Sequence, residues 1–221
     1  MFTEDTLKDR VVLITGGGSG LGLAMAKAAA ACGARLLLCG RSNERLKNAE
    51  NELALPAERI FTYSVDVRDY EGVATMVKEG IDYFGRIDAL INNAAGNFYC
   101  LSEELSPGGF KTIVDIVLNG TFNCTQHFGR HAIARGGGGV VLNIVTTYTE
   151  TGSSFVLPSA CAKAGVYALT TSLAYEWGIY GIRLNSIAPG PFPTEGAWKR
   201  LVPDKRLEEI LRQQNPLQRF G

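Results

Sequence analysis

The sequence lacks any excess of charge of one sign, because its 221 residues include 22 Lys and Arg against 22 Asp and Glu. This balance argues against nucleic acid or an anionic membrane as the main partner, since both select for a basic surface. No apolar run approaches the ~20 residues of a membrane-spanning helix. Residues 1–10 have neither the apolar core of a signal peptide nor the Arg- and Ser-rich bias of a transit peptide. We therefore expect a soluble cytoplasmic protein with no nucleic-acid or membrane partner.

The sequence also lacks paired metal-ligand or disulfide motifs. Its five cysteines are scattered and form no Cys-x-x-Cys pair, a usage that is typical of a reducing compartment with thiols acting as small buried hydrophobes. His127 and His131 have the spacing of a metal-binding pair on a helix, but no carboxylate or third ligand lies near them in the sequence. We expect no metal site.

Short β-branched runs alternate with longer helical patterns along the whole chain. This alternation predicts right-handed β-α-β crossovers and an α/β fold, a single doubly wound parallel sheet with helices on both faces. The expected strands are Val11–Thr15, Arg35–Gly40, Ile60–Ser64, Ala89–Asn92, Val140–Thr146 and Arg183–Ile187. The expected helices are Leu21–Ala31, Asn43–Leu53, Tyr70–Phe84, Phe110–Arg135 and Ser159–Tyr180. No linker divides the chain, so we expect residues 1–221 to form one domain.

A glycine-rich loop follows the first strand and opens an Ala-rich helix, the context that a dinucleotide-binding loop requires. Gly16 would permit the tight turn, Gly20 would let the backbone approach a pyrophosphate, and Gly22 would let helix and strand pack closely. The free N–H groups at the helix start would hold the anion. A glycine turn without a ligand is the alternative, which this context disfavours. The expected phosphate-binding residues are Gly16, Ser19, Gly20, Leu21 and Gly22.

The residues after the second expected strand predict NADPH rather than NADH. Folds that select NAD place an acidic residue there for the ribose 2′-hydroxyl, whereas this chain has Arg41 and Ser42. An arginine suits a 2′-phosphate through charge-assisted hydrogen bonds, although Arg41 could also be a solvated surface residue. Asp66, which precedes Val67 after the third strand, could accept from the adenine amino group or cap the following helix.

Five motifs in order give the chain a resemblance to the short-chain dehydrogenase/reductase family: Thr15–Gly22, Asn92–Gly96, Asn119, Ser159–Gly165 and Pro189–Gly190. The resemblance implies a Rossmann-type NADP-binding domain with a substrate lid around residues 192–215, and a homotetramer formed through the two long helices. The family normally continues beyond this point, so we expect the last strand of the sheet to be missing. The implied cofactor contacts also include Val67, Asn93, Ala94, Lys163, Pro189, Gly190 and Phe192.

The chain departs from the family at its catalytic tyrosine. Most members carry Tyr-x-x-x-Lys on the long helix and a serine at the end of the fifth strand, whereas here Ser159 precedes Lys163 and Thr146 takes the place of the serine. An alkyl hydroxyl is a poorer proton donor than a phenol. Together with Tyr148 and Asn97, this arrangement resembles the 2,4-dienoyl-CoA reductases, which reduce a conjugated dienoyl thioester with NADPH to a 3-enoyl-CoA.

The resemblance implies a role for each of these residues. Hydride addition to a dienoyl thioester creates a dienolate, whose oxygen Tyr148 and Asn97 would hold as hydrogen-bond donors. Lys163 and Ser159, one helical turn apart, would hold the nicotinamide ribose, and Asn119 would support the lysine through a water. Two alternatives remain open: Tyr148 as an exposed loop tyrosine, and Ser159 as a helix-capping hydroxyl.

Two rival functions also remain open. One is a carbonyl reductase or alcohol dehydrogenase of the same family that uses a rearranged tyrosine. The other is a catalytically silent dinucleotide-binding protein, a hypothesis prompted by the missing helix tyrosine. The cations between positions 199 and 206 could either reach the phosphates of an acyl-CoA substrate or belong to a solvated amphipathic helix.

Overall fold

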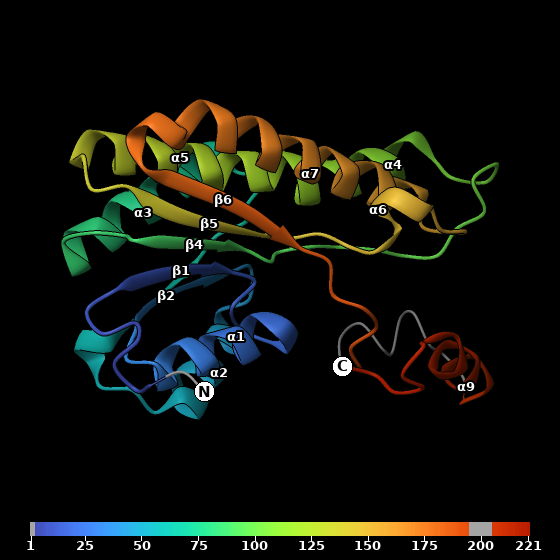
Figure 1. Cartoon of the computed structure of the whole chain (residues 1–221), viewed down its shortest axis with the longest axis horizontal. Coiled ribbons are helices and arrows are strands. Elements are labelled where there is room, and N and C mark those ends of the chain that lie inside the picture. The colour runs from blue at the N-terminus through green and yellow to red at the C-terminus, as the bar shows by residue number, and fades with distance from the viewer. Residues whose placement is uncertain (1–2, 195–204) are drawn as a thin grey trace.

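A computed structural model describes residues 3–194 and 205–221 of the chain. It contains one parallel sheet of six strands in the order β3-β2-β1-β4-β5-β6 (Figure 1). The expected α/β fold is therefore confirmed, and four of the six strands have the predicted bounds. The strands are β1 (Val11–Thr15), β2 (Arg35–Gly40), β3 (Ile60–Ser64), β4 (Ala89–Asn92), β5 (Gly139–Ile144) and β6 (Ile182–Ile187).

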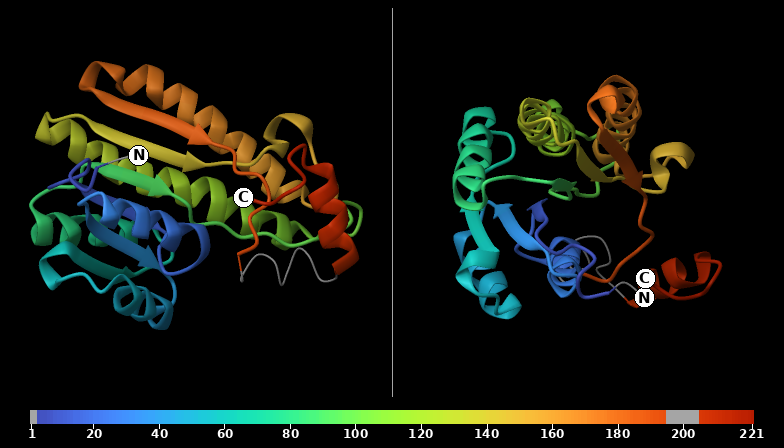
Figure 2. Two further views of the ribbon diagram at one scale, coloured as in Figure 1. Left: turned by 60° about the horizontal axis from the view of Figure 1, so that its bottom comes forward. Right: turned by 60° about the vertical axis from the view of Figure 1, so that its left-hand side comes forward.

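Helices cover both faces of the sheet, which Figures 1 and 2 show as separate layers. Side chains alternate along a strand, so Val11 and Leu13 join one buried cluster while Val12 and Ile14 join the other. Burying each such side chain stabilises the fold by about 1.5–3 kcal/mol relative to leaving it exposed. The helices are α1 (Gly20–Ala31) and α2 (Asn43–Leu53) on one face, with α3 (Tyr70–Phe84), α5 (Gly120–Arg135) and α7 (Leu157–Trp177) on the other.

The fifth strand ends two residues earlier than the sequence pattern predicts. The expected strand Val140–Thr146 is observed as Gly139–Ile144, and the chain then turns into a short helix, α6 (Tyr148–Thr151). The neighbouring strand β6 pairs with Ile144 through its last residue, Ile187. Pro189 follows and cannot extend a ladder because it has no N–H. A strand that continued to Tyr148 would place Thr146 and Tyr148 on one face by alternation. Because β5 ends at Ile144, alternation does not apply to these two residues.

The expected helix Phe110–Arg135 is interrupted by a wider turn. α4 (Pro107–Val114) begins three residues early, because Ser106 caps it by accepting from the N–H of Gly109 (3.0 Å). A π-helical turn, η2 (Asp115–Asn119), then joins α4 to α5. Such turns insert a residue into a helix and are frequent at functional sites. The expected helix Ser159–Tyr180 is also adjusted, since α7 begins at Leu157 and a 3₁₀ turn, η3 (Gly178–Tyr180), follows it.

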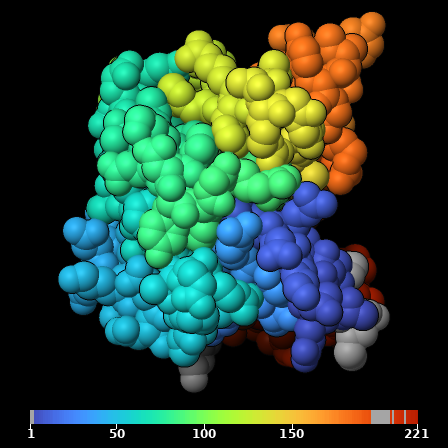
Figure 3. Space-filling model, turned by 90° about the vertical axis from the view of Figure 1, so that its left-hand side faces the viewer, coloured from blue at the N-terminus to red at the C-terminus, as the bar shows by residue number. Residues whose placement is uncertain are grey.

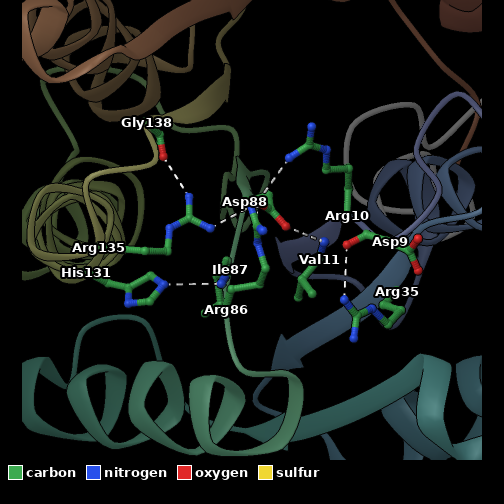
Figure 4. A network of polar contacts seen from close by, with 10 residues as sticks. All are labelled: Asp9, Arg10, Val11, Arg35, Arg86, Ile87, Asp88, His131, Arg135 and Gly138. Atoms are coloured by element: carbon green, nitrogen blue, oxygen red, sulfur yellow. Dashed lines mark hydrogen bonds and ion pairs between the residues drawn. The ribbon is translucent and has the colours of Figure 1, made fainter.

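Figure 3 views the molecule from the end at which the strands begin. At this end a buried carboxylate joins the amino ends of β1 and β4. Asp88, just before β4, is 7% exposed and accepts from the N–H of Val11 at 3.0 Å and from Arg135 at 3.1 Å. Arg86 and Arg10 also pair with it (Figure 4). Burial alone would raise the pKa of Asp88, but these hydrogen bonds and charges outweigh burial and lower it. Asp88 thus fastens β4 to β1 at the end of the sheet opposite the glycine loop.

The two helix histidines have structural contacts in this fold. The Nε2 atom of His131 accepts from the N–H of Ile87 (3.3 Å), as Figure 4 shows. The ring of His127 lies with its centroid 4.4 Å from that of Tyr70. Within residues 3–194 and 205–221, no group of three His, Cys, Asp or Glu could hold a metal ion.

Residues 188–194 follow the carboxyl end of β6, and the described chain resumes at α9 (Lys205–Gln214), the red helix of Figures 1 and 2. In the described part of the chain β6 is an edge strand. The same part holds no helix long and apolar enough to cross a membrane. Of the expected lid at 192–215, residues 195–204 lie outside the described residues, as do the cations Lys199 and Arg200.

Candidate active site

The candidate site residues follow the carboxyl ends of β1, β2, β3, β4, β5 and β6. In an open parallel sheet, ligands bind outside these ends, where neighbouring strands connect in opposite directions. The strand order reverses at β1. The chain adds β2 and β3 on one side of β1 and then β4, β5 and β6 on the other side. The sheet therefore brings the glycine loop and the catalytic candidates to one edge.

The glycine loop takes a conformation that only glycine accommodates well. Gly16 has a φ of +66°, the left-handed region that side chains disfavour. A Cβ atom on Gly22 would lie 2.2 Å from the carbonyl oxygen of Gly16, so the first turn of α1 packs directly against the loop. The roles that the sequence predicts for these two glycines match this geometry.

The start of α1 has the free donors that a phosphate requires. Ser19 is the N-cap residue, but its side chain makes no capping hydrogen bond, and the first turn holds no acidic residue. By contrast, Ser42 caps α2 and Asp69 caps α3 through their side chains. The N–H groups and the positive end of α1 are thus left for an external anion. The loop from Gly16 to Gly22 fits the pyrophosphate of a dinucleotide.

Thr15 ties the glycine loop to the loop after β4. Its buried hydroxyl accepts from the N–H groups of Asn93 (3.0 Å) and Ala94 (2.9 Å). The Asn93 side chain returns a bond from Nδ2 to the Thr15 carbonyl at 3.0 Å. These contacts fix the predicted cofactor residues Asn93 and Ala94 beside Gly16. Sequence reasoning used Thr15 only as part of a motif and missed this role.

The segment after β6 returns to the glycine loop. A Cβ atom on Gly20 would lie 3.5 Å from the side chain of Thr194, a residue that the sequence analysis missed although its hydroxyl closely follows Pro189–Gly190. Phe192, which is 37% exposed, lines a hollow with Gly190 and the last residues of the described chain. The predicted nicotinamide contacts therefore lie on the same segment as Thr194.

A second hollow lies beside β2 and β3, lined by Arg41, Tyr63, Ser64, Val65, Asp66, Asp69 and Gly72. Arg41 has no ion pair among the described side chains, whereas Asp66 pairs with Arg68 at 2.7 Å. The hydrogen bond from Arg68 outweighs burial and lowers the pKa of Asp66. The alternative that Asp66 caps the next helix is wrong, because Asp69 accepts from the N–H of Gly72 (3.0 Å) there. Val67 follows at the same loop.

Tyr148 and Ser159 are joined by a hydrogen bond. The phenol oxygen lies 3.0 Å from the Ser159 Oγ, which links the first residue of α6 to the first turn of α7. Ser159 is 3% exposed. The N-cap of α7 is Val156, with no side-chain capping bond, so the alternative that Ser159 is a capping hydroxyl is wrong. Tyr148 is half-buried and bonded, unlike a free loop tyrosine.

Lys163 lies one helical turn beyond Ser159, on the same side of α7. It is 5% exposed and its Nζ donates to the carbonyl oxygen of Ile144, the last residue of β5. Burial lowers the pKa of Lys163 from 10.5 to about 8, because the charged form loses its hydration. An ammonium group has three donors, so two remain for a ligand at the end of β5.

Asn97 has its amide group held in one orientation. Its Oδ1 accepts from the N–H of Phe98 at 2.9 Å, and its Nδ2 makes no hydrogen bond within the described residues. The free end is therefore the NH₂ group, which can only donate. Asn97 and Tyr148 come from two loops that a backbone hydrogen bond joins, from the N–H of Cys100 to the carbonyl of Phe155 (2.9 Å).

Two further polar residues differ from expectation in what they contact. The Thr146 Oγ1 is buried and has no hydrogen-bond partner among the described residues, an arrangement that is costly unless a ligand satisfies it. Sequence reasoning left Thr146 out of the catalytic residues. Asn119 is exposed and its Nδ2 donates to Asp115 (2.9 Å) within η2, so its predicted water-mediated support of Lys163 stays a prediction.

Comparison with known proteins gives the chain a family. The family model for short chain dehydrogenases matches residues 10–203. A probable 2,4-dienoyl-CoA reductase of Bacillus subtilis, described as (2E)-enoyl-CoA-producing, is 44% identical over 216 residues, which cover 97% of this chain and 85% of that protein. The mouse peroxisomal 2,4-dienoyl-CoA reductase, described as (3E)-enoyl-CoA-producing, is 39% identical over 222 residues, which cover 100% of this chain and 76% of that protein.

A solved structure supports the same assignment. The crystal structure of a short chain dehydrogenase from Bacillus anthracis superposes with a TM-score of 0.90 at 44% sequence identity, covering 98% of this chain and 85% of that one. The family implies an oxidoreductase that uses a nicotinamide dinucleotide, and the loop from Gly16 to Gly22 has the geometry for it. The chain belongs to the short-chain dehydrogenase/reductase family and, within it, groups in sequence with the 2,4-dienoyl-CoA reductases.

Proposed function

We propose that this chain reduces 2,4-dienoyl-CoA thioesters with NADPH. The hydrogen bond between Tyr148 and Ser159 (3.0 Å) carries the proposal. It puts a phenol beside the position where most relatives carry their catalytic tyrosine, displaced from α7 onto α6. Relatives named as dienoyl-CoA reductases, at 39–44% identity, support the substrate class.

The displaced phenol suits a thioester better than a ketone. Reduction of a ketone ends with a proton on the oxygen, whereas reduction of a conjugated dienoyl thioester ends with a proton on carbon. The thioester oxygen carries the negative charge only in between, so it needs hydrogen-bond donors rather than a proton. Tyr148 supplies one such donor, held in place by Ser159. Loss of one donor of this kind typically costs about 10²–10³ in rate.

Asn97 supplies the second donor. Its carbonyl end accepts from the Phe98 N–H, so its NH₂ end is left to donate to the thioester oxygen. Two donors on separate loops can approach one oxygen from different directions. The loops are tied by the bond from Cys100 to Phe155, which keeps both donors preorganised.

Lys163, Ser159 and Asn119 position the cofactor in this proposal. When bound, NADPH supplies the hydride. Lys163 donates to the nicotinamide ribose hydroxyls, and its buried Nζ fixes the ribose against the end of β5. Ser159 holds both Tyr148 and the same edge of the ribose, and Asn119 supports the lysine through a water. Asn93, Ala94, Pro189, Gly190 and Phe192 contact the nicotinamide end.

NADPH is preferred to NADH because of the residues after β2. Arg41 has no ion pair within the described residues and stands where NAD-selective folds place an acid. Ser42 accepts from the N–H of Arg45 (3.3 Å), so its hydroxyl proton remains free to donate. Asp66 accepts a hydrogen bond from the adenine amino group, and the backbone N–H of Val67 donates one to the adenine.

The product follows from where the proton lands. Hydride adds to the δ carbon of the dienoyl chain, which shifts a double bond to the β,γ position of the dienolate, and a proton then adds to the α carbon, so a 3-enoyl-CoA forms. Delivery of the proton to the γ carbon would instead give a 2-enoyl-CoA. The names of the relatives include both outcomes, and we propose the 3-enoyl product.

Residues 1–221 act as one domain in this proposal, with a lid around 192–215 and a homotetrameric assembly through the two long helices. The chain works as a cytoplasmic enzyme. Cations of the lid would meet the phosphates of coenzyme A.

Steady-state assays on matched substrates test the proposal. We expect oxidation of NADPH with 2,4-hexadienoyl-CoA and 2,4-decadienoyl-CoA, and none with 3-oxoacyl-CoA or simple ketones. Turnover of the carbonyl compounds alone would make the chain a carbonyl reductase. Dinucleotide binding, measured by calorimetry, without turnover of any thioester would make it a catalytically silent binder.

A further inference from the structure

Four large apolar side chains are exposed around the catalytic loops. Tyr99 and Leu101 follow Asn97 and are 47% and 42% exposed, and Phe155 and Leu157 precede Ser159 and are 50% and 40% exposed. In Figure 1 the loop after β4 and the segment after α6 lie at the same end of the molecule, beyond the carboxyl ends of the strands. Exposed apolar surface is costly unless something covers it, and a contiguous patch marks a binding site.

The two aromatic rings contact each other across the loops. The centroids of Tyr99 and Phe155 are 6.5 Å apart, with the rings edge to face at 83°. A backbone hydrogen bond from the N–H of Cys100 to the carbonyl of Phe155 joins the same two segments. Tyr99 lies two residues after Asn97 and Phe155 lies four residues before Ser159, so the aromatic pair stands on the two segments that carry these site candidates.

The backbone at Phe155 is unfavourable for a residue with a side chain. Its φ of +65° is left-handed, a conformation that persists only where the surroundings impose it and that occurs often at ligand-binding sites. The strain is not repaid by burial of the ring, because the ring is 50% exposed. The conformation thus leaves the phenyl group of Phe155 half exposed beside Tyr99.

Charge indicates which part of a thioester could cover this surface. Glu103 and Glu104 are exposed on the loop after β4, and Glu150 is exposed on α6. These carboxylates would repel the phosphates of coenzyme A. A hydrocarbon chain has no charge and gains by covering aromatic rings. We infer that Tyr99 and Phe155 form one wall of the subsite that holds the acyl chain beyond the conjugated double bonds. This inference rests on the proposed function, and it makes the pair a determinant of chain-length preference.

Variants of both residues test the inference. Phe155→Gly removes the ring and favours the left-handed backbone, so it removes a contact without adding strain. Tyr99→Ala removes the other ring, and Tyr83→Ala is the matched control, because Tyr83 is also 47% exposed but lies on α3, outside the site and outside the two long helices. The measurement is the ratio of kcat/KM for 2,4-decadienoyl-CoA to that for 2,4-hexadienoyl-CoA, with the dissociation constant for NADP as a check of folding.

We expect the ratio to fall at least about tenfold in each wall variant, because a single methylene in an apolar pocket can be worth that much, and to stay unchanged in the control. An unchanged ratio in an active wall variant overturns the inference. If the wild-type chain turns over no dienoyl-CoA, the proposed function fails. The wall is then judged by calorimetry with decanoyl-CoA and hexanoyl-CoA, where an equal affinity ratio in wild type and variants overturns it. A change of mass in sedimentation also overturns it, since the pair would then be a contact between copies.

Discussion

The phenol of Tyr148 and the hydroxyl of Ser159 are 3.0 Å apart and bind each other across two helices. Each residue therefore depends on the other for its position. Ser159→Ala should lower kcat for dienoyl-CoA about threefold to tenfold, since a hydrogen bond of this kind contributes about 0.5–1.5 kcal/mol. Tyr148→Phe should lower kcat more, by at least about tenfold and up to 10³-fold, because it removes the donor itself.

The matched control for the phenol is Tyr167→Phe, at a 45% exposed tyrosine of the same α7 helix. Its kcat should equal that of the wild type. If Tyr148→Phe retained full turnover, the phenol would have no part in stabilising the thioester oxygen. If Ser159→Ala and Tyr148→Phe lost activity without a change in NADP affinity, the contact would act on the substrate side.

Lys163 makes cofactor binding depend on pH near neutrality. Its pKa of about 8 means that the ammonium form, which donates to the ribose, is lost as the pH rises through this value. We expect the dissociation constant for NADP to rise between pH 7 and pH 9 in the wild type. In Lys163→Met the dissociation constant for NADP should be larger than that of the wild type at pH 7, and it should not depend on pH over this range. Fluorescence titration measures both, and a flat wild-type profile would contradict the low pKa.

The same shift has the opposite sign for folding. The unfolded chain keeps the ordinary pKa of 10.5, so between about 8 and 10.5 it binds more protons at Lys163 than the folded chain does. The free energy of unfolding that this residue contributes therefore rises with pH across that window. Urea unfolding measures this effect: the free energy of unfolding of the wild type, relative to that of Lys163→Met, should increase as the pH rises.

The hydrophobic periodicity and the sequence motifs were sufficient to predict most of the fold. β1 to β4, α2 and α3 have the predicted bounds, because buried parallel strands read as apolar runs and because Ser42 and Asp69 cap their helices. The end of β5 could not be predicted, since it depends on where its neighbour β6 stops. The η2 turn was equally hidden, because a π-helical insertion leaves the apolar period of a single helix almost unchanged.

The sequence predicted those parts of the site in which the backbone conformation requires one residue type. It did not predict contacts between side chains that are distant in the sequence. Gly16, Gly22 and Lys163 lie where the motifs place them. The contact of Tyr148 with Ser159 joins positions eleven apart through a turn, and the network from Asn92 through Asn143 to Thr170 links β4, β5 and α7. Neither pattern has a sequence period, so only the folded structure brings these groups together.

Gly22 should tolerate no side chain. In Gly22→Ala the new Cβ would lie 2.2 Å from the Gly16 carbonyl oxygen, a backbone atom that cannot move away without opening the loop. We expect NADP affinity to fall at least about tenfold, because the loop can no longer present its N–H groups together. The control is Gly108→Ala in α4, where the Cβ would meet nothing within 4 Å, and where stability should rise by about 0.5–1 kcal/mol. Calorimetry of both variants measures affinity and melting temperature.

Asp88 should matter for stability and not for catalysis. Asp88→Asn removes the charge that Arg86 and Arg135 share while both cations remain, which should cost about 1–3 kcal/mol of unfolding free energy. The pKa of Asp88 is lowered in the folded state, so its contribution is present at neutral pH and is lost as the pH falls through that pKa. The difference between wild type and variant should thus shrink in acid. Asp82→Asn, which breaks an exposed pair with Lys78 (61% and 74% exposed), should cost less than about 0.5 kcal/mol.

Arg41 should decide between the two nicotinamide cofactors. Among the described side chains it has no ion pair, although its charge helps to lower the pKa of Asp66. In Arg41→Ala no partner is therefore left buried and unpaired, and the main loss is the contact with a 2′-phosphate. A charge-assisted hydrogen bond is worth about 1.5–3 kcal/mol, which corresponds to roughly tenfold or more in kcat/KM for NADPH. The value for NADH should stay the same, because NADH carries a hydroxyl there. Arg183→Ala, at an exposed position of β6, should change neither value. Equal losses for both cofactors would assign Arg41 to the shared part of the dinucleotide, and selection for NADPH would then lie elsewhere.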